Sequence, residues 1–145
     1  MENTVSLATG THSGQPTQPR ERVEFASSVI RSSIVRVTVT GEIDAANALS
    51  LSKYVEAELE TISRLILDLR ALTFFGTQGF SILHRVNVMC SRHAVNWVVL
   101  SGREVDRVLR ICDPDGGLAV TDAMEEAITA VVRPPRSHLR LVSNR

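Results

Sequence analysis

Two short and almost continuously apolar segments limit the fold of this chain more than any other feature. They read RLILDL at residues 64–69 and VNWVVL at residues 95–100. Apolar runs of this length are typical of interior strands that are covered on both faces. A segment of helical periodicity stands between them, so the pattern predicts parallel strands joined by right-handed helical crossovers, as in α/β proteins.

Alternating apolar and polar residues predict two further strands, at residues 23–30 and 34–40, which the turn RSS joins into a hairpin. A last short strand is expected at residues 118–120. Apolar stripes of helical spacing predict four helices, at residues 48–62, 79–90, 105–112 and 122–132. The order ββαβαβαβα therefore predicts an α/β fold with a mixed sheet of about five strands, an N-terminal hairpin and about four helices.

Two acidic residues mark expected helix starts. Asp44 follows the hairpin, where its carboxylate can cap the first helix by accepting a free amide hydrogen bond. Asp122, with Glu125 three residues later, has the spacing of a capping box at the start of the last helix. Asp44 is also a candidate contact for a partner protein.

The length of 145 residues suits one domain. We expect a flexible arm at residues 1–20, the domain at residues 21–132 and a flexible basic tail at residues 133–145. The tail carries four arginines and no acidic residue. Contact with nucleic acid or a membrane is one interpretation of this tail, and a solvated tail is favoured because it has no interleaved aromatic residues.

The charges of the whole chain argue against a polyanionic partner. Its 16 basic and 16 acidic side chains cancel, so no overall field favours nucleic acid or an anionic membrane. No apolar run approaches the roughly 18 residues of a membrane span, and the N-terminus lacks the apolar region of a signal peptide. The sequence therefore predicts a cytoplasmic protein without stable membrane insertion.

Residues that could form an enzyme active site are not grouped in the sequence. The four histidines lack the spacing of metal ligands, and neither a P-loop nor a GxSxG motif is present. We therefore expect no catalytic residues, no cofactor and no metal. Cys90 and Cys112 are interpreted first as small buried side chains, and second as two thiols on neighbouring helices that could meet under oxidation.

The segment LTFFGTQGF contains the clearest candidate for a functional loop. Gly76 and Gly79 permit a tight turn from strand to helix. Thr77 lies between them as the N-cap or a first-turn residue, and its hydroxyl can accept a hydrogen bond from an amide near Gly79 or Phe80. A phosphoryl group on this hydroxyl would face the positive end of the helix, so phosphorylation could repel a docked partner and leave the fold intact.

Phe80 has two interpretations. Its ring lies about 100° round the helix from Gly79, on the face that also carries His84, so it can be exposed as an anchor for a partner. Alternatively, the ring is tucked under the loop at residues 41–44.

Four segments, taken in their order and spacing, resemble the STAS domain, which is the fold of bacterial anti-sigma-factor antagonists. The resemblance covers residues 23–132, and the segments read VTGEIDAANA, LILDLRALTFFGTQGFSIL, SGREVDRVLRICDPDGGL and DAMEEAI. It implies the same α/β fold that the periodicity predicts.

The resemblance also implies a mechanism for the loop. In that family the turn commonly reads Asp-Ser-Ser-Gly or Asp-Ser-Thr-Gly, and an anti-sigma factor with an ATP-dependent kinase fold phosphorylates the first hydroxyl residue. This position falls on Thr77. The unphosphorylated protein would bind the anti-sigma factor and free a sigma factor for transcription. Two departures are that Gly76 stands in place of the aspartate and Gln78 in place of the second hydroxyl residue.

Two functions follow as hypotheses, and neither specifies an oligomeric state. The first is an anti-sigma-factor antagonist that phosphorylation at Thr77 switches off. The second is a STAS scaffold without phosphorylation, as a subunit of a transporter or sensory complex, which Gly76 and Gln78 favour. The expected partner-binding residues are Asp44, Gly76, Thr77, Gln78, Gly79, Phe80 and His84.

Overall fold

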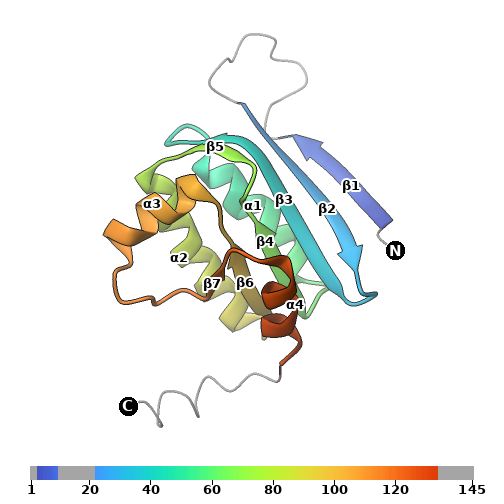
Figure 1. Ribbon diagram of the computed structural model, residues 1–145. Helices are drawn as coiled ribbons and strands as arrows, with labels where there is room; N and C mark the ends of the chain where they lie inside the picture. The colour runs from blue at the N-terminus through green and yellow to red at the C-terminus, as the bar shows by residue number, and fades with distance from the viewer. Residues whose placement is uncertain (1–2, 10–21, 134–145) are drawn as a thin grey trace.

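The computed structural model describes residues 3–9 and 22–133, which form an α/β fold with a mixed sheet and four helices (Figure 1). The predicted fold class is confirmed. In chain order the elements are β1 (Asn3–Thr9), β2 (Val23–Ile30), β3 (Ile34–Ile43), α1 (Ala48–Leu59), β4 (Arg64–Asp68), β5 (Leu72–Phe75), α2 (Thr77–Arg92), β6 (Asn96–Leu100), α3 (Arg103–Cys112), β7 (Val120–Thr121) and α4 (Met124–Val132).

The sheet has the strand order β1-β2-β3-β4-β6-β7, and β5 also pairs with β3. The predicted hairpin is confirmed, because β2 and β3 pair antiparallel from Val23 opposite Gly41 to Ile30 opposite Ile34. The later strands are parallel, as predicted, in the pairs β3–β4, β4–β6 and β6–β7. The carboxyl ends of these parallel strands therefore meet at one edge of the sheet.

Strand β4 is covered on both faces, as its apolar sequence predicted. Leu65 and Leu67 are fully buried in the larger core cluster, which also contains the buried residues of α1, α2 and α3. Ile66 points the other way, into a smaller cluster with Ile128 and Val131 of α4. Figure 1 shows α4 on the opposite side of the sheet from α1 and α2, and α3 beside β5 and α2.

Two strands were not predicted. Residues 3–9 fall in the stretch expected to be a flexible arm, yet they form β1, which pairs antiparallel with β2. Strand pairing uses main-chain hydrogen bonds that polar residues also supply, so the lack of large apolar residues did not exclude a strand here. Residues 10–21 of the expected arm and residues 134–145 of the expected tail lie outside the described residues. The second unpredicted strand, β5, has only four residues.

The two predicted helix caps are wrong in detail. Helix α1 begins at Ala48, after a turn at residues 45–47, and the Asp44 carboxylate accepts the amide of Ala46 within this turn (2.9 Å). Buried Asn47 occupies the N-cap position without a side-chain capping bond: its Oδ1 accepts the Asp44 amide and its Nδ2 donates to the Glu42 carbonyl, so it ties the turn to β3.

The capping box expected at Asp122 is not formed either. Helix α4 begins at Met124 without a side-chain capping bond. The Thr121 hydroxyl instead accepts the amide of Ala123 (3.3 Å) and donates to Glu126 Oε1 (2.6 Å). Thr121 lies in β7, which occupies residues 120–121 rather than the predicted 118–120.

Substitution of Gly41 tests the close packing of β3 against the start of β2. Gly41 has φ +103°, and a Cβ there would lie 1.8 Å from the Arg22 carbonyl oxygen, whereas Gly116 has φ +69° and no atom within 4 Å of such a Cβ. We expect Gly116→Ala to lower the free energy of unfolding by about 1–2 kcal/mol, from backbone strain alone. Gly41→Ala should cost about 3 kcal/mol or more, because the backbone must also move.

Urea denaturation followed by the fluorescence of the single tryptophan, Trp97, measures both losses. Equal losses for the two variants would contradict the close approach of Gly41 to Arg22.

Candidate functional site

The loop at residues 76–80 is positioned by the parallel pairing of β5 with β3. Phe74 lies opposite Glu42 and Phe75 opposite Ile43, and the Gly76 amide continues the ladder by donating to the Ile43 carbonyl (2.9 Å). The turn that follows β3 therefore lies beside the start of α2. This arrangement brings half-buried Asp44 to the same edge of the sheet as Gly76 and Thr77.

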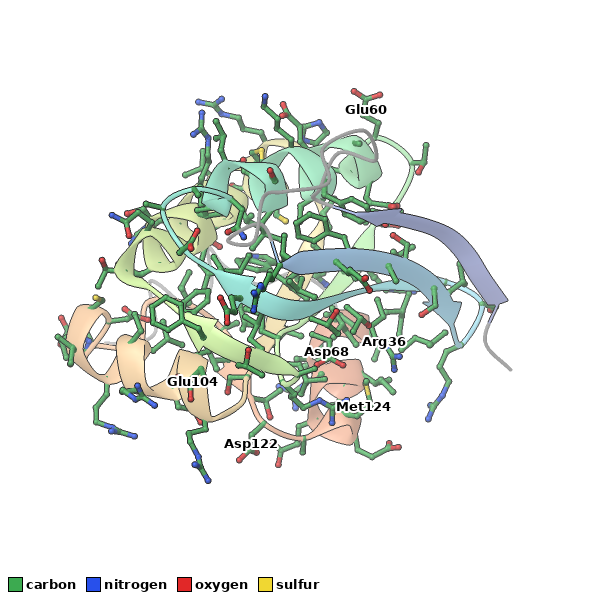
Figure 2. All side chains as sticks on the ribbon, turned by 90° about the horizontal axis from the view of Figure 1, so that it is seen from above. Arg36, Glu60, Asp68, Glu104, Asp122 and Met124 are labelled. Atoms are coloured by element: carbon green, nitrogen blue, oxygen red, sulfur yellow. The ribbon has the colours of Figure 1, made fainter. Side chains whose placement is uncertain are left out.

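A buried carboxylate fixes the turn that leads from β4 to β5. Asp68 is 5% exposed and accepts the amide of Arg70 (3.1 Å) together with its Nε and Nη2 (3.0 Å each). These hydrogen bonds raise the pKa of the Arg70 guanidinium. Figure 2 shows Asp68 beside Arg36 of β3, on the side of the sheet that carries Met124, and Arg36 Nε lies 4.0 Å from Asp68 Oδ2.

Thr77 is the first residue of α2 and its side chain is exposed. Gly76 occupies the N-cap position, and the capping hydrogen bond expected from the Thr77 hydroxyl is absent from this helix start. The Gly79 amide instead donates to the Gly76 carbonyl (2.9 Å). The hydroxyl therefore faces solvent at the positive end of a 16-residue helix with no acidic residue in its first turn, where negative charge is favourable.

Gly79 is required by the packing beneath the loop. A Cβ at Gly79 would lie 2.4 Å from Cε1 and 2.5 Å from Cζ of the Phe75 ring, and that ring is only 3% exposed. Gly79 is therefore a buried packing residue. Gln78, next to it, is exposed.

Phe80 is half-buried, which lies between its two predicted positions. Its ring packs against the larger core cluster and meets the His84 ring edge to face, with 5.1 Å between centroids. His84 is exposed, one turn further along α2. Phe80 and His84 therefore form one continuous surface that begins at Thr77.

Phe74 is a candidate site residue that the sequence interpretation missed. Its side chain is 45% exposed, and its Cε2 lies 3.3 Å from the place that a Cβ on Gly76 would occupy. The doubled phenylalanine was an available signal, because adjacent residues of a strand point to opposite faces and so only one of Phe74 and Phe75 can reach the core. An exposed aromatic ring thus adjoins Gly76 and Thr77.

The two cysteines are free thiols. Cys90 is 1% exposed, and burial raises its pKa to about 12, whereas Cys112 is half-buried. Within residues 3–9 and 22–133, no group of three or more His, Cys, Asp or Glu side chains is arranged to hold a metal ion. In the same part of the chain, no helix has both the length and the apolar character that a membrane span requires.

Comparison with known proteins identifies a domain family. The family model described as the STAS domain matches residues 26–127. Among curated proteins, osmosensory protein A of Mycobacterium tuberculosis is 35% identical over 78 residues, which are 53% of this chain and 49% of that protein. The chain therefore matches about half the length of this relative.

Two solved structures have a similar fold. An anti-sigma factor antagonist from Mycobacterium paratuberculosis superposes with a TM-score of 0.68 at 23% identity, covering 77% of this chain and 95% of that one. The anti-sigma factor antagonist SpoIIAA in its unphosphorylated form gives a TM-score of 0.60 at 16% identity, covering 77% and 99%. At these identities the likeness establishes the fold.

The two glycines of the loop should respond differently to alanine. We expect Gly79→Ala to lower the free energy of unfolding by about 1–3 kcal/mol, because its methyl group collides with the buried Phe75 ring. Gly76→Ala should change it by less than about 1 kcal/mol, since the exposed Phe74 ring can move aside. Urea denaturation of both variants provides the comparison, and a larger loss at Gly76 would refute this packing.

The raised pKa of Cys90 makes this thiol inert in the native state. With a pKa of about 12, only about one molecule in ten thousand carries the thiolate at pH 8. We expect iodoacetamide to leave Cys90 unmodified in the native protein and to alkylate it in urea, as measured by peptide mass spectrometry. Complete labelling of the native protein would contradict the burial of Cys90.

Proposed function

The chain belongs to the STAS domain family, and from this premise we propose that it is an anti-sigma-factor antagonist. It binds an anti-sigma factor that has an ATP-dependent kinase fold, and so frees a sigma factor for transcription. Phosphorylation of Thr77 by that partner ends the binding. Asp44, the loop at residues 76–78, Phe80 and His84 contribute to the surface, together with Phe74, and Gly79 supports it from beneath.

The exposed hydroxyl of Thr77 at the first residue of α2 is the observation that carries this proposal. A phosphoryl group there would add about two negative charges at a helix start that tolerates them, so the fold would persist. The same charges would lie within the surface that includes Phe74 and Phe80, where they would repel a partner and keep its apolar groups hydrated. Binding would change without unfolding.

A non-phosphorylated scaffold in a sensory or transporter complex is the second candidate. Gly76 lacks the carboxylate that the family commonly has at this position, and Gln78 lacks the second hydroxyl. The curated relative is named an osmosensory protein, which favours a sensory role for this alternative. In that case the surface around Phe74 would bind its partner constitutively.

Affinity capture from a lysate of the source organism tests the proposal. The wild-type chain and the Thr77→Glu variant serve as separate baits. We expect the wild type to retain a kinase-type anti-sigma factor, and Thr77→Glu to weaken this binding by more than about tenfold through like-charge repulsion. Ser91→Glu adds the same charge at an exposed position near the far end of α2 and should bind as the wild type does.

Incubation of the captured anti-sigma factor with ATP separates the two candidates. Phosphopeptide mass spectrometry should place phosphate on Thr77 of the wild type and none on Thr77→Val, which keeps the shape of the side chain. Phosphate only at other residues would exclude Thr77 as the switch. Capture of a permease or sensor complex alone, with no anti-sigma factor, would favour the scaffold.

A further inference from the structure

Helix α3 presents a line of three exposed arginines. Arg103, Arg107 and Arg110 follow the spacing i, i+4 and i+7, so their side chains leave the helix within about 60° of one another over a length of about 10 Å. Ile111 is 76% exposed and lies about 40° round the helix from Arg107. We call Arg103, Arg107 and Arg110 the arginine stripe.

The stability of α3 does not explain the whole stripe. Arg110 lies in the last turn, where a cation interacts favourably with the helix dipole, but Arg103 is the first residue, where the dipole disfavours a cation. Arg107 Nη2 lies 3.1 Å from both carboxylate oxygens of Glu104, which is the one ion pair that the described residues form with the stripe. Arg103 forms no ion pair with the described residues, so its guanidinium is available to an external anion.

Two neighbouring acidic side chains, Asp106 and Asp113, make hydrogen bonds within the domain. Asp106 Oδ1 accepts the Ser101 hydroxyl (2.7 Å). The Asp113 carboxylate accepts the amides of Gly117 and Leu118 (2.8 and 3.1 Å). These carboxylates stabilise the two ends of α3, so they do not neutralise the stripe by ion pairs.

The stripe begins at the same edge of the sheet as the surface at Thr77. Helix α3 begins just after β6, at the edge of the sheet where α2 begins after β5, and α3 packs against β5. A Cβ on Gly102 would lie 3.0 Å from the Cα and carbonyl oxygen of Arg70, so the start of α3 rests on the turn that leads into β5. A partner that covers Phe74 and Thr77 can therefore reach Arg103.

The charge of the surrounding domain favours a protein partner over a polyanion. Residues 22–133 contain 12 arginine and lysine side chains against 14 aspartate and glutamate side chains, a net charge of −2. Long polyanions such as nucleic acid need basic side chains spread over a wide surface. Three guanidinium groups in about 10 Å, one of them paired with Glu104, lie beside an exposed isoleucine and match a short acidic segment that also carries an apolar side chain.

We propose that the arginine stripe is a docking surface for an acidic segment of the anti-sigma factor, adjoining the loop at Thr77. This inference rests on the proposed function. The stripe would speed association and fix the orientation of the partner. Each Arg guanidinium could donate two parallel hydrogen bonds to one carboxylate of the partner. Phosphorylation at Thr77 would act on the neighbouring contact and not on the stripe.

The triple variant Arg103→Gln, Arg107→Gln, Arg110→Gln tests the stripe, because glutamine keeps much of the side-chain length and a good helix propensity. The probe is the purified kinase-type anti-sigma factor. We expect Kd to rise by at least about tenfold at about 50 mM NaCl, and by less than about threefold at about 300 mM, where salt also weakens the wild type.

The matched control is Arg31→Gln, Arg92→Gln, Arg133→Gln. It removes the same charge from exposed positions at the opposite edge of the sheet: in the β2–β3 turn, at the end of α2 and after α4. We expect its Kd to stay within about twofold of the wild type. Circular dichroism and urea midpoints of both variants confirm that each is folded.

The outcomes separate this inference from the proposed function. If the stripe variant binds the anti-sigma factor with unchanged Kd and unchanged salt dependence, while Thr77→Glu still releases it, only the docking surface is refuted. If no kinase-type anti-sigma factor binds the wild type, both proposals fail. Stripe-dependent binding of the wild type to phosphatidylserine vesicles or to duplex DNA, rather than to the anti-sigma factor, would also overturn the inference.

Discussion

The parallel pairing of β5 with the end of β3 determines where the candidate site lies. Strand β3 has ten residues, and it pairs with β4 along its first half and with β5 along its second half. The chain can change partners in this way because Asp68 binds Arg70 and holds the intervening turn. The Gly76 amide then pairs with the Ile43 carbonyl, and the Phe75 ring lies under Gly79. Thr77 is left at the surface as a consequence of these contacts.

Because of these contacts, the residues that stabilise this part of the domain are different from the residues that form its surface. The buried residues of β5 and α2 face the core, whereas Phe74, Thr77 and Gln78 are exposed and contribute little to it. The start of α2 has no side-chain cap to lose, so a modified Thr77 need not break a hydrogen bond of the fold. This independence allows a phosphate to change the contact while the domain keeps its fold.

The sequence was most informative where side-chain burial alone decides the structure. The strands at residues 23–30 and 64–69 and the stripe of α2 were predicted because one or both faces must be apolar. Strands β1 and β5 were missed because main-chain pairing determines them and neither is apolar throughout. The caps failed for a related reason: Asp44 binds an amide of the turn before α1, and Thr121 rather than Asp122 binds an amide before α4. Local sequence does not rank such alternative side-chain hydrogen bonds. Gly76 and Gly79 marked the loop correctly, but only the position of the Phe75 ring distinguishes their roles.

The aromatic ring of Phe74 and the arginine stripe would contribute to partner recognition through different physical interactions. Exposed cations act over about 8–10 Å at physiological salt and so influence the encounter and orientation of a partner, whereas an aromatic ring contributes only when its surface is dehydrated in the complex. Gly76 has no carboxylate, so a partner that approaches Phe74 meets an apolar ring instead of a fixed negative charge. A phosphoryl group on Thr77 would add about two negative charges to this contact, which already includes the Asp44 carboxylate. These charges would oppose binding by dehydration as well as by repulsion, because a charge buried in an apolar contact loses its hydration.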